Sequence, residues 1–431
     1  MTAFGSVNPS APTAASRAKP ASAIASRTTA SGKPILLFTA FEPSGDDHAS
    51  HVIAELKRRH PYLTIYAWGG PKMERAGAII IERTGDDAVM GVPGFQKIIE
   101  HGKINRRIDE WLEDNRVTVH IPVDSPAANF PICQLTRSRG TKIVHMVAPQ
   151  MWAWGPWRVG KLRRLTDKVL CLLPFEEQWF LSRGVPAKFV GHPLFDEPLD
   201  YPAIDARVEA LRDRLPQPEG PKDLAAKTAP KIAMMPGSRP KELKGTLPAL
   251  LDAFRRVQAD FPKARAVLAV TRPEIEHELR RRAEKLGGWP DGMTVVAGDT
   301  DAVVRWCDFA LVKSGTVTLY VARQHKPMVT FYRPDKLSYY LVGKWIVSTP
   351  LFTLPNLIAG KKIVPELIPH FGDGQDLAVG IYRIMRQPNF ADDMRDELAK
   401  MCKKFDGTSA ATGAADAIEE MAGIRPAAVA G

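Results

Sequence analysis

Three loops carry the polar side chains best suited to chemistry, and each loop follows a short apolar run. Asp124 ends one run, and Asn129 stands five residues further along the chain. The other two loops read Phe41-Glu42-Pro43-Ser44-Gly45-Asp46-Asp47 and Pro236-Gly237-Ser238-Arg239. In open α/β sheets, ligands bind where strand ends open onto helix N-termini, whose free N–H groups attract anions. Loops of this kind in both halves of the chain predict two nucleotide-binding-like domains that face one cleft.

The elements that must position these loops alternate between strand and helix from Pro34 onward, the pattern of a parallel sheet. Residues 35–39 form an apolar run, and after the Ser44-Gly45-Asp46 turn the apolar residues recur at helical spacing. Further strands are expected at 64–68, 117–123, 142–147, 168–173, 231–235, 266–270, 293–297, 308–312 and 327–331. The predicted fold class is therefore α/β.

The chain is longer than one hydrophobic core usually serves, so its 431 residues predict two domains. Residues 197–230 are rich in Pro, Asp and Lys and indicate a hinge. The predicted units are 33–200, 201–375 and a group of carboxyl-terminal helices at 376–431. Residues 1–32 have few large apolar side chains and predict a disordered basic tail. That tail resembles a transit peptide in composition but lacks the apolar region of a secretory signal.

The formal net charge of +11 predicts an anionic partner, either nucleic acid, a phospholipid surface or a phosphorylated substrate. No nucleic-acid-reading motif accompanies the charge, which favours the other two partners. No apolar run reaches the ~18 residues of a transmembrane helix. The four cysteines lack any C-x-x-C pairing, so neither a disulfide framework nor a zinc ribbon is expected, and a reducing cytoplasm fits best.

A series of motifs between residues 35 and 370 stands in the order found in one enzyme family. The motifs are Glu42-x-Ser44-Gly45-Asp46, Val89-Met90-Gly91, Asp124-x-Pro126, Pro149-Gln150-Met151-Trp152-Ala153-Trp154, Leu173-Pro174-Phe175-Glu176, Gly191-His192-Pro193, Pro236-Gly237-Ser238-Arg239-x-x-Glu242, Ser314-Gly315-Thr316 and Leu354-Pro355-Asn356-Leu357. The tryptophan string is the most specific of them, whereas Ser-Gly-Thr alone would mean little. Taken together, these motifs resemble the lipid-A-disaccharide synthase family.

The resemblance implies a GT-B glycosyltransferase, with two Rossmann-like, doubly wound domains and an active site in the cleft between them. Members of the family transfer 2,3-diacylglucosamine from its UDP donor to 2,3-diacylglucosamine 1-phosphate, forming the β-1,6 disaccharide of lipid A and UDP. The implied enzyme is an inverting hexosyltransferase that needs no metal or other cofactor. It would act as a peripheral protein on the inner face of the cytoplasmic membrane, where anionic substrates match the positive net charge. A homodimer is possible.

This chemistry requires a carboxylate that takes the proton of the acceptor's 6-hydroxyl on the side opposite the departing UDP. Asp124 is the predicted catalytic base, because it ends a buried strand and matches the family's Asp-x-Pro aspartate. The alternative is an aspartate that only caps the loop. Asp299-Thr300-Asp301 has the spacing of a metal-binding pair, but Asp299 precedes a predicted helix and is expected to be its N-cap.

The departing diphosphate must also be held, a task that suits helix N-termini and a guanidinium. Residues expected at the UDP-sugar are Ser44, Ser238, Arg239, Ser314, Gly315, Thr316, Tyr320, Asn356 and Glu366. From the sequence alone, Arg239 could equally be a solvated loop arginine, and the serines and Asn356 could be caps or turn formers.

Aromatic and apolar residues beside basic ones suit an interface with acyl chains and phosphates. Met90, Val92, Trp152, Trp154 and Arg158 are the predicted contacts with the lipid or acceptor. Core packing is the alternative role for at least one of the tryptophans. The apolar loop that contains Met90 could likewise be a packed turn.

Four positions depart from the family pattern: Phe41, Gly94, Ala127 and Tyr320 replace a glycine, a glutamate, an aspartate and a glutamate, respectively. Tyr320 could still bond a ribose, although as a neutral partner. These changes keep two alternatives open. One is a divergent GT-B relative that uses another acceptor or UDP-sugar, or that epimerises a UDP-sugar. The other is a binding protein without turnover.

Overall fold

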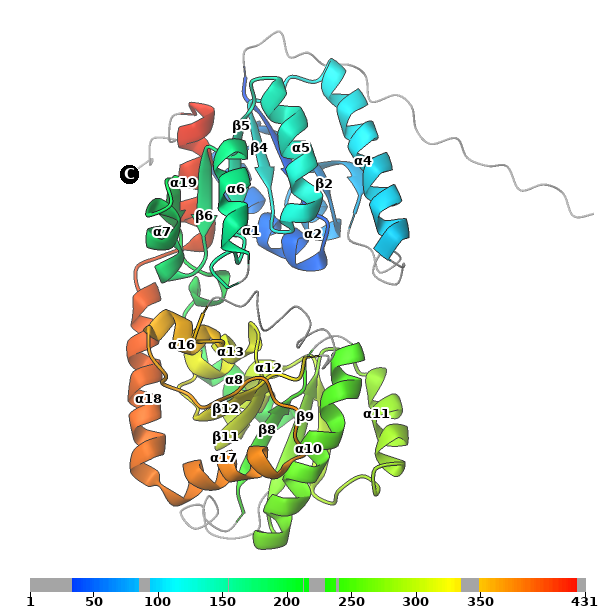
Figure 1. Cartoon of the computed structure of the whole chain (residues 1–431), viewed down its shortest axis with the longest axis vertical. Coiled ribbons are helices and arrows are strands. Elements are labelled where there is room, and N and C mark those ends of the chain that lie inside the picture. Colours follow the sequence, from blue (N-terminus) through cyan, green and yellow to red (C-terminus); the bar gives the residue numbers. More distant parts are fainter. Residues whose placement is uncertain are drawn as a thin grey trace, which may run out of the picture.

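The computed structural model describes residues 33–84, 94–153, 155–211, 213–216, 229–237, 240–334 and 349–424. They form two α/β units, one above the other in Figure 1, each with a parallel sheet between helices. The expected fold class is confirmed. Residues 1–32, for which a disordered tail is predicted, lie outside the described residues.

The first unit is built on a seven-stranded parallel sheet in the order β3-β2-β1-β4-β5-β6-β7. Its strands are β1 (Ile35–Thr39), β2 (Thr64–Gly69), β3 (Ile79–Arg83), β4 (Val119–Pro122), β5 (Lys142–Met146), β6 (Lys168–Cys171) and β7 (Ala187–Phe189). The central strands β1 and β4 are buried along their whole length, as expected for a parallel sheet covered on both faces. That burial explains why β1 appears in the sequence as a continuous apolar run, whereas in β4 the buried His120 stands between apolar residues.

Helices cover both faces of this sheet. The helical elements are α1 (Pro43–Arg59), α2 (Pro71–Arg75), α4 (Gly94–Asp114), α5 (Pro126–Ser138), η1 (Pro156–Arg158), α6 (Val159–Leu165) and α7 (Pro174–Leu181). On one face, Leu36 and Phe38 of β1 pack in a cluster with α1 and with the last helix, α19 (Ala410–Ala422). On the other face, Ile35 and Leu37 pack with α4 and α5. Alternate residues of β1 therefore pack into separate hydrophobic cores, one on each face of the sheet.

The second unit is built on a six-stranded parallel sheet in the order β10-β9-β8-β11-β12-β13. Its strands are β8 (Lys231–Met235), β9 (Arg265–Val270), β10 (Met293–Ala297), β11 (Phe309–Lys313), β12 (Met328–Phe331) and β13 (Glu366–Leu367). Its helices are α8 (Tyr201–Ala210), α10 (Pro240–Asp260), α11 (Ile275–Glu284), α12 (Thr300–Trp306), α13 (Val317–Arg323), α16 (Leu354–Ala359), α17 (Gln375–Arg386) and α18 (Pro388–Cys402).

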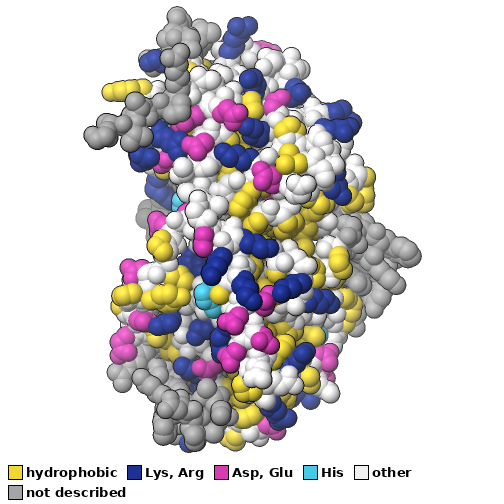
Figure 2. Space-filling model, turned by 90° about the vertical axis from the view of Figure 1, so that its left-hand side faces the viewer, with side chains coloured by type: hydrophobic (Ala, Val, Ile, Leu, Met, Phe, Trp, Pro, Cys, Tyr) yellow, Lys and Arg dark blue, Asp and Glu magenta, His cyan; other side chains and the backbone are white. Residues whose placement is uncertain are grey.

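The chain passes between the two units twice, and the two passages contact each other. The first contains η2 (Pro193–Phe195), and the second contains η4 (Lys403–Phe405) and leads into α19. The rings of Phe195 and Phe405 stack at 4.1 Å, and the Asp196 carboxylate accepts a 2.8 Å hydrogen bond from the amide of Ala410. Figure 1 shows α18 and α19 along this edge, and Figure 2 views the same side, with Lys and Arg side chains spread over both units.

A buried polar contact lies where the units meet beside these passages. Trp152 is 7% exposed, and its indole Nε1 donates a 2.9 Å hydrogen bond to Glu176 Oε1, while Phe175 packs edge-on against the indole. Trp152 belongs to the same apolar cluster as the second sheet. Burial raises the pKa of Glu176 to about 7, against the opposing effect of the hydrogen bonds from Trp152 and the backbone.

The central strands of both sheets agree with the sequence prediction to within a few residues, whereas the strands β3, β7 and β13 were missed. The division of the chain at residues 200 and 375 stays a prediction. In the described part of the chain, no helix has both the length and the apolar content needed to cross a bilayer.

Candidate active site

Each sheet has one point where the strand order reverses, and these two points bring the predicted site loops together. In the first sheet the reversal lies between β1 and β4, so the loop with Ser44 stands beside Asp124. In the second sheet it lies between β8 and β11, so the loop at Gly237 stands beside Ser314. Such reversals create the crevices in which α/β sheets bind ligands.

The two sets of loops face each other across the units. The charges of Asp47 and Lys72 in the first unit act on the Tyr320 hydroxyl in the second, although burial is the main reason why the pKa of Tyr320 is raised. Within the first unit, the rings of His48 and His192 meet edge to face, with their centroids 6.3 Å apart. Asp47 and Lys72 of the first unit are thus near enough to Tyr320 of the second to affect its charge, which agrees with a cleft between the units.

Asp124 is held in an unusual backbone conformation at the end of β4. Its φ is +49°, and that of Ser125 is +36°, both in the left-handed region that few L-residues adopt. Asn129 supports this turn, because its Nδ2 donates to the carbonyl oxygens of Val123 at 3.1 Å and Asp124 at 2.9 Å. Asn129 Oδ1 in turn accepts a 2.7 Å hydrogen bond from the Thr39 hydroxyl on β1. The strained backbone at Asp124 is therefore held in place by contacts with β1, β4 and α5.

The electrostatic environment of Asp124 suits a group that must accept a proton. Burial raises the pKa of the Asp124 carboxyl, the backbone N–H of Ser125 opposes that rise, and the nearby Glu42 carboxylate adds to it. Ser125 Oγ donates a 3.0 Å hydrogen bond to Glu42 Oε1, which keeps the two acidic groups at the same turn. A carboxylate with a raised pKa is a stronger base than an exposed one.

The loop after β1 divides into an accessible part and a structural part. Ser44 is exposed in the first turn of α1. Asp46 is buried and accepts hydrogen bonds of 3.0 Å from the amides of Gly70, Lys72 and Met73, which fixes the start of α2. Phe41, which replaces a family glycine, packs its ring edge-on against His101. The loop thus leaves Ser44 available to a ligand.

The crevice of the second sheet contains a buried lysine that sequence reasoning missed. Lys313 ends β11 and is 9% exposed, and its Nζ lies 3.1 Å from Glu242 Oε1 and 4.9 Å from the centre of the Tyr332 ring. Gly237, with φ +109°, lies so close that a Cβ there would be 2.9 Å from the Cδ of Lys313. A lysine that ends an apolar run directly before Ser314 is the sequence signal that could have revealed it.

The turn after Lys313 is partly open. Gly315 and Thr316 are exposed, whereas Ser314 is half-buried and its Oγ donates a 3.3 Å hydrogen bond to the carbonyl of Phe352. Tyr320 follows on α13. Ser238 and Arg239, predicted to bind the same diphosphate, lie outside the described residues.

Asn356 and Glu366 are both engaged in holding their own domain together. Asn356 is fully buried, its Nδ2 donates to the Val364 carbonyl at 2.9 Å, and its Oδ1 accepts from the Ile363 amide at 2.7 Å. Glu366 Oε1 accepts three hydrogen bonds from Phe352 and Thr353. Glu366 Oε2 is buried and has no hydrogen-bond partner within the described residues. Of the two side chains, only Glu366 keeps an acceptor atom for a ligand, and donor binding by either stays a prediction.

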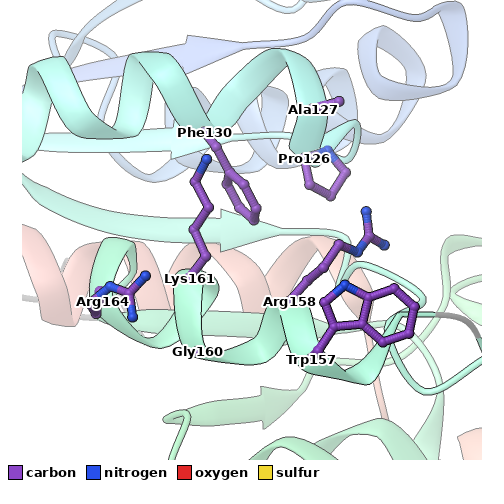
Figure 3. A pocket seen from close by; sticks show the side chains of 8 residues that line it. All are labelled: Pro126, Ala127, Phe130, Trp157, Arg158, Gly160, Lys161 and Arg164. Atoms are coloured by element: carbon purple, nitrogen blue, oxygen red, sulfur yellow. The ribbon is translucent and has the colours of Figure 1, made fainter.

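Of the residues predicted at the lipid or acceptor, Met90, Val92 and Trp154 lie outside the described residues. Trp152 is buried against Glu176, which is the packing role that the sequence left open for one tryptophan. Arg158 is half-buried and lines a cavity of about 380 Å³ between α5 and α6, shown in Figure 3. Ala127, where the family has an aspartate, lines the same cavity, and Gly94 begins α4.

Asp299 is the N-cap of α12, because its Oδ1 accepts a 3.0 Å hydrogen bond from the amide of Ala302, as the sequence predicts. Its other oxygen lies 3.0 Å from Arg207 Nε. Among the residues that the structure describes, no cluster of three or more His, Cys, Asp or Glu side chains is arranged to hold a metal ion.

Comparison with known proteins matches this chain over most of its length. Residues 36–387 match the family described as lipid-A-disaccharide synthetase. The lipid-A-disaccharide synthase of Myxococcus xanthus (strain DK1622) is 31% identical over 392 residues, which cover 90% of this chain and 97% of the relative. The enzyme of the same name from Pseudomonas putida (strain GB-1) is 35% identical over 381 residues, which cover 86% of this chain and 95% of the relative.

Solved structures with this arrangement of domains are more distant in sequence. The glycotransferase of kitacinnamycin has a TM-score of 0.59 at 14% identity, with 90% of this chain and 99% of that one covered. The S. aureus MnaA-UDP co-structure has a TM-score of 0.57 at 11% identity, with 91% and 98% covered. Both likenesses concern the fold, and they agree with a GT-B architecture.

Proposed function

The chain belongs to the lipid-A-disaccharide synthase family, and from this premise we propose which residues carry out the family's reaction. The protein is a glycosyltransferase of lipid A biosynthesis. It joins 2,3-diacylglucosamine from a UDP donor to 2,3-diacylglucosamine 1-phosphate and releases UDP. Proton removal, diphosphate binding and substrate positioning each fall to a different group of side chains.

Asp124 is the catalytic base of the proposed mechanism. Its carboxylate takes the proton of the acceptor's 6-hydroxyl while the hydroxyl oxygen attacks the anomeric carbon of the donor. The bond from that carbon to the UDP oxygen breaks, and its electron pair leaves with UDP. The observation that carries this assignment is the place of Asp124 at the reversal of the first sheet, in a strained turn held by Asn129 and with a raised pKa.

The diphosphate of the donor is held at the reversal of the second sheet. Gly315 and Thr316 offer an exposed turn, and Ser314, Ser238 and Arg239 complete the set predicted from the sequence. Lys313 joins this set in our proposal, because a buried ammonium group in the crevice can neutralise the charge that develops on the departing UDP. Glu242 balances the charge of Lys313 when no nucleotide is bound.

The sugar and uridine are positioned by groups around this cradle. Glu366 offers its unpartnered Oε2, and Tyr320 offers a hydroxyl that faces the first unit. Ser44 approaches from the opposite unit. Asn356 acts on the donor through the loop that its amide holds in place.

Contact with the membrane follows from the nature of the substrates, since both carry acyl chains. The proposed lipid contacts are Met90, Val92, Trp154 and Arg158, whereas Trp152 packs in the core. A net charge of +11 favours an anionic bilayer surface, which supports the proposal of a peripheral protein on the inner face of the cytoplasmic membrane. Pairing into a homodimer stays a prediction.

The substitution Asp124→Asn in the full-length protein tests the proposed base. UDP release from the two lipid substrates should fall by roughly two to four orders of magnitude, because an amide cannot accept the proton. UDP affinity, measured by titration calorimetry, should stay nearly unchanged. Asp299→Asn is the matched control, because asparagine caps a helix as well as aspartate does. Unchanged turnover in Asp124→Asn would remove this residue from the mechanism.

A second candidate function is the use of a different UDP-sugar or acceptor, or the epimerisation of a UDP-sugar. It is motivated by Tyr320, a neutral side chain where the family has a glutamate. Mass spectrometry of the products formed from a panel of UDP-sugars would distinguish the two functions. Turnover of the lipid donor at a much lower rate than that of another UDP-sugar would favour the second. A binding protein without turnover would form no product with any of them.

A further inference from the structure

A cavity of about 380 Å³ lies beside the turn that carries Asp124. One wall is the first part of α5, and the other is formed by η1 and α6. The lining residues are Pro126, Ala127, Phe130, Trp157, Arg158, Gly160, Lys161 and Arg164. Figure 3 shows Arg158 and Lys161 extending from η1 and α6 toward α5, with Arg164 further along the same helix.

The charge of this lining is entirely positive. Arg158, Lys161 and Arg164 follow one another at intervals of three residues, and none of the eight lining residues is acidic. Lys161 Nζ lies 5.3 Å from the centre of the Phe130 ring, an arrangement that holds the ammonium group over an aromatic face without neutralising it. A cavity of this composition favours a compact anion with several oxygen atoms, such as a phosphate monoester.

The rim of the cavity is apolar. Trp157 is 69% exposed, although large aromatic side chains are usually buried. Pro126 and Ala127 form the opposite rim. An exposed indole beside a cationic cavity suits a ligand that joins a charged group to an apolar one.

The position of the cavity relative to Asp124 indicates which part of a substrate it could receive. Pro126 is the first residue of α5 and follows Ser125 and Asp124 directly. The N-terminus of α5, a helix of 13 residues, therefore borders the cavity. The partial positive charge at this end of the helix dipole adds to the charge of the three cations. An anion bound beside Pro126 would lie next to the turn that carries the proposed base.

We propose that this cavity binds the phosphate group of the acceptor, with Lys161 and Arg164 as its ligands and Arg158 as a third cation. The inference rests on the proposed function, because it places the acceptor's 6-hydroxyl at Asp124. One end of the sugar ring then presents its hydroxyl to the base, and the other end carries the phosphate into the cavity. Trp157 contacts the apolar part of the same molecule. Recognition of the phosphate thereby sets the orientation in which the acceptor attacks.

A phospholipid headgroup has the same chemistry, but it fits the position less well. A headgroup site needs only an exposed basic surface, whereas this cavity lies between two helices at the end of the catalytic turn. The acceptor is therefore the occupant to which the proposal commits, and the membrane is an outcome that the experiment can reveal.

The test compares the double variant Lys161→Gln/Arg164→Gln with the wild type and with Arg163→Gln. Arg163 is an exposed arginine of the same helix that does not line the cavity, so its replacement controls for the loss of a positive charge from α6. The KM for the phosphorylated acceptor should rise by roughly ten- to a hundredfold in the double variant, as expected for lost charged hydrogen bonds. The KM for the donor and the melting temperature should not change, and Arg163→Gln should behave like the wild type.

An acceptor without its phosphate provides the second arm. The wild type should use this molecule with a raised KM, and the double variant should use it no worse than the wild type does. If the double variant still prefers the phosphorylated acceptor as strongly as the wild type, the proposal is wrong. It is also wrong if the double variant only loses binding to vesicles of anionic phospholipid, while its KM for the acceptor in detergent micelles is unchanged.

Direct binding separates this proposal from the proposed reaction. Acceptor affinity can be measured by calorimetry in the presence of UDP, without turnover. If the wild type forms no disaccharide but the double variant still loses acceptor binding selectively, the assignment of the cavity stands while the proposed reaction does not. If both proteins bind the acceptor equally, the cavity is not its phosphate site, whatever the turnover.

Discussion

The pKa of Asp124 is raised by burial and further by the carboxylate of Glu42. As a base, Asp124 works only when deprotonated, so kcat/KM should fall as the pH drops below its pKa. Replacing Glu42 with Gln removes a like charge and lowers that pKa, so the acid limb of the pH profile should move to lower pH. The profiles of wild type and Glu42→Gln test this, and an unmoved limb would show that another group controls it.

Glu176 links stability to pH at the contact between the units. Burial raises its pKa to about 7 in the folded protein, from an ordinary value of 4.5 in the unfolded chain. The raised value favours the protonated folded state, so this stabilisation is complete below the unfolded pKa and is lost as the pH rises toward 7. The unfolding free energy of the wild type, relative to Glu176→Gln, should therefore fall by a few kcal/mol between pH 4 and pH 8, on the order of one kcal/mol per unit of pKa shift.

Chemical denaturation of both proteins at the two pH values measures that difference. A constant difference between them would mean that the pKa of Glu176 is the same in the folded and the unfolded protein. Replacing Glu420, an exposed residue that pairs with Lys168, provides a control, since surface ion pairs contribute little.

At the level of elements, Lys313 connects the end of β11 to the first turn of α10 through Glu242. The substitution Lys313→Met keeps the length of the side chain but removes its charge, so UDP should bind roughly tenfold more weakly or worse. Calorimetric titration with UDP measures the loss, and a steeper salt dependence in the wild type should accompany it. Lys362→Met, an exposed lysine of the same unit, is the control. Equal UDP affinity in wild type and Lys313→Met would exclude Lys313 from the cradle.

The central strands could be predicted from the sequence because parallel strands buried on both faces leave continuous apolar runs, as in β1 and β8. The strands β7 and β13 escaped because two or three residues carry no periodicity. β3 escaped because its residues are half-buried or exposed at the sheet edge.

The same reasoning explains why some features of the candidate site could be predicted from the sequence and others could not. Asp124 could be proposed from the sequence because a carboxylate directly after an apolar run is visible there. The buried hydrogen-bond partners of Trp152 and Asn356 could not be predicted, because these contacts depend on how distant segments of the chain pack together. Lys313 was overlooked because a lysine at the end of a strand is usually a solvated side chain.

At the level of the whole molecule, the last helix stabilises the first unit, although it follows the second in sequence. Ile418 of α19 is fully buried with residues of α1 and the first sheet, and Glu419 lies 3.2 Å from Arg59 of α1. The substitution Ile418→Asp places a charge in this core and should cost more than ~3 kcal/mol. Thermal unfolding should show the first unit melting early while the second is nearly unaffected. A single unshifted transition would contradict this.

The two passages of the chain between the units lie side by side, joined by the Phe195–Phe405 stack and the Asp196 hydrogen bonds. Two chain connections at the same edge allow essentially one low-energy rotation of one unit relative to the other. The axis of that rotation runs through both connections. Displacement then grows with distance from that axis. In Figure 1, α4 and α11 lie on the far side and should travel most, whereas α7 and α16 lie near the axis and should hardly separate. Spin labels on each pair would report this difference when UDP binds, and equal changes at both pairs would rule out such an axis.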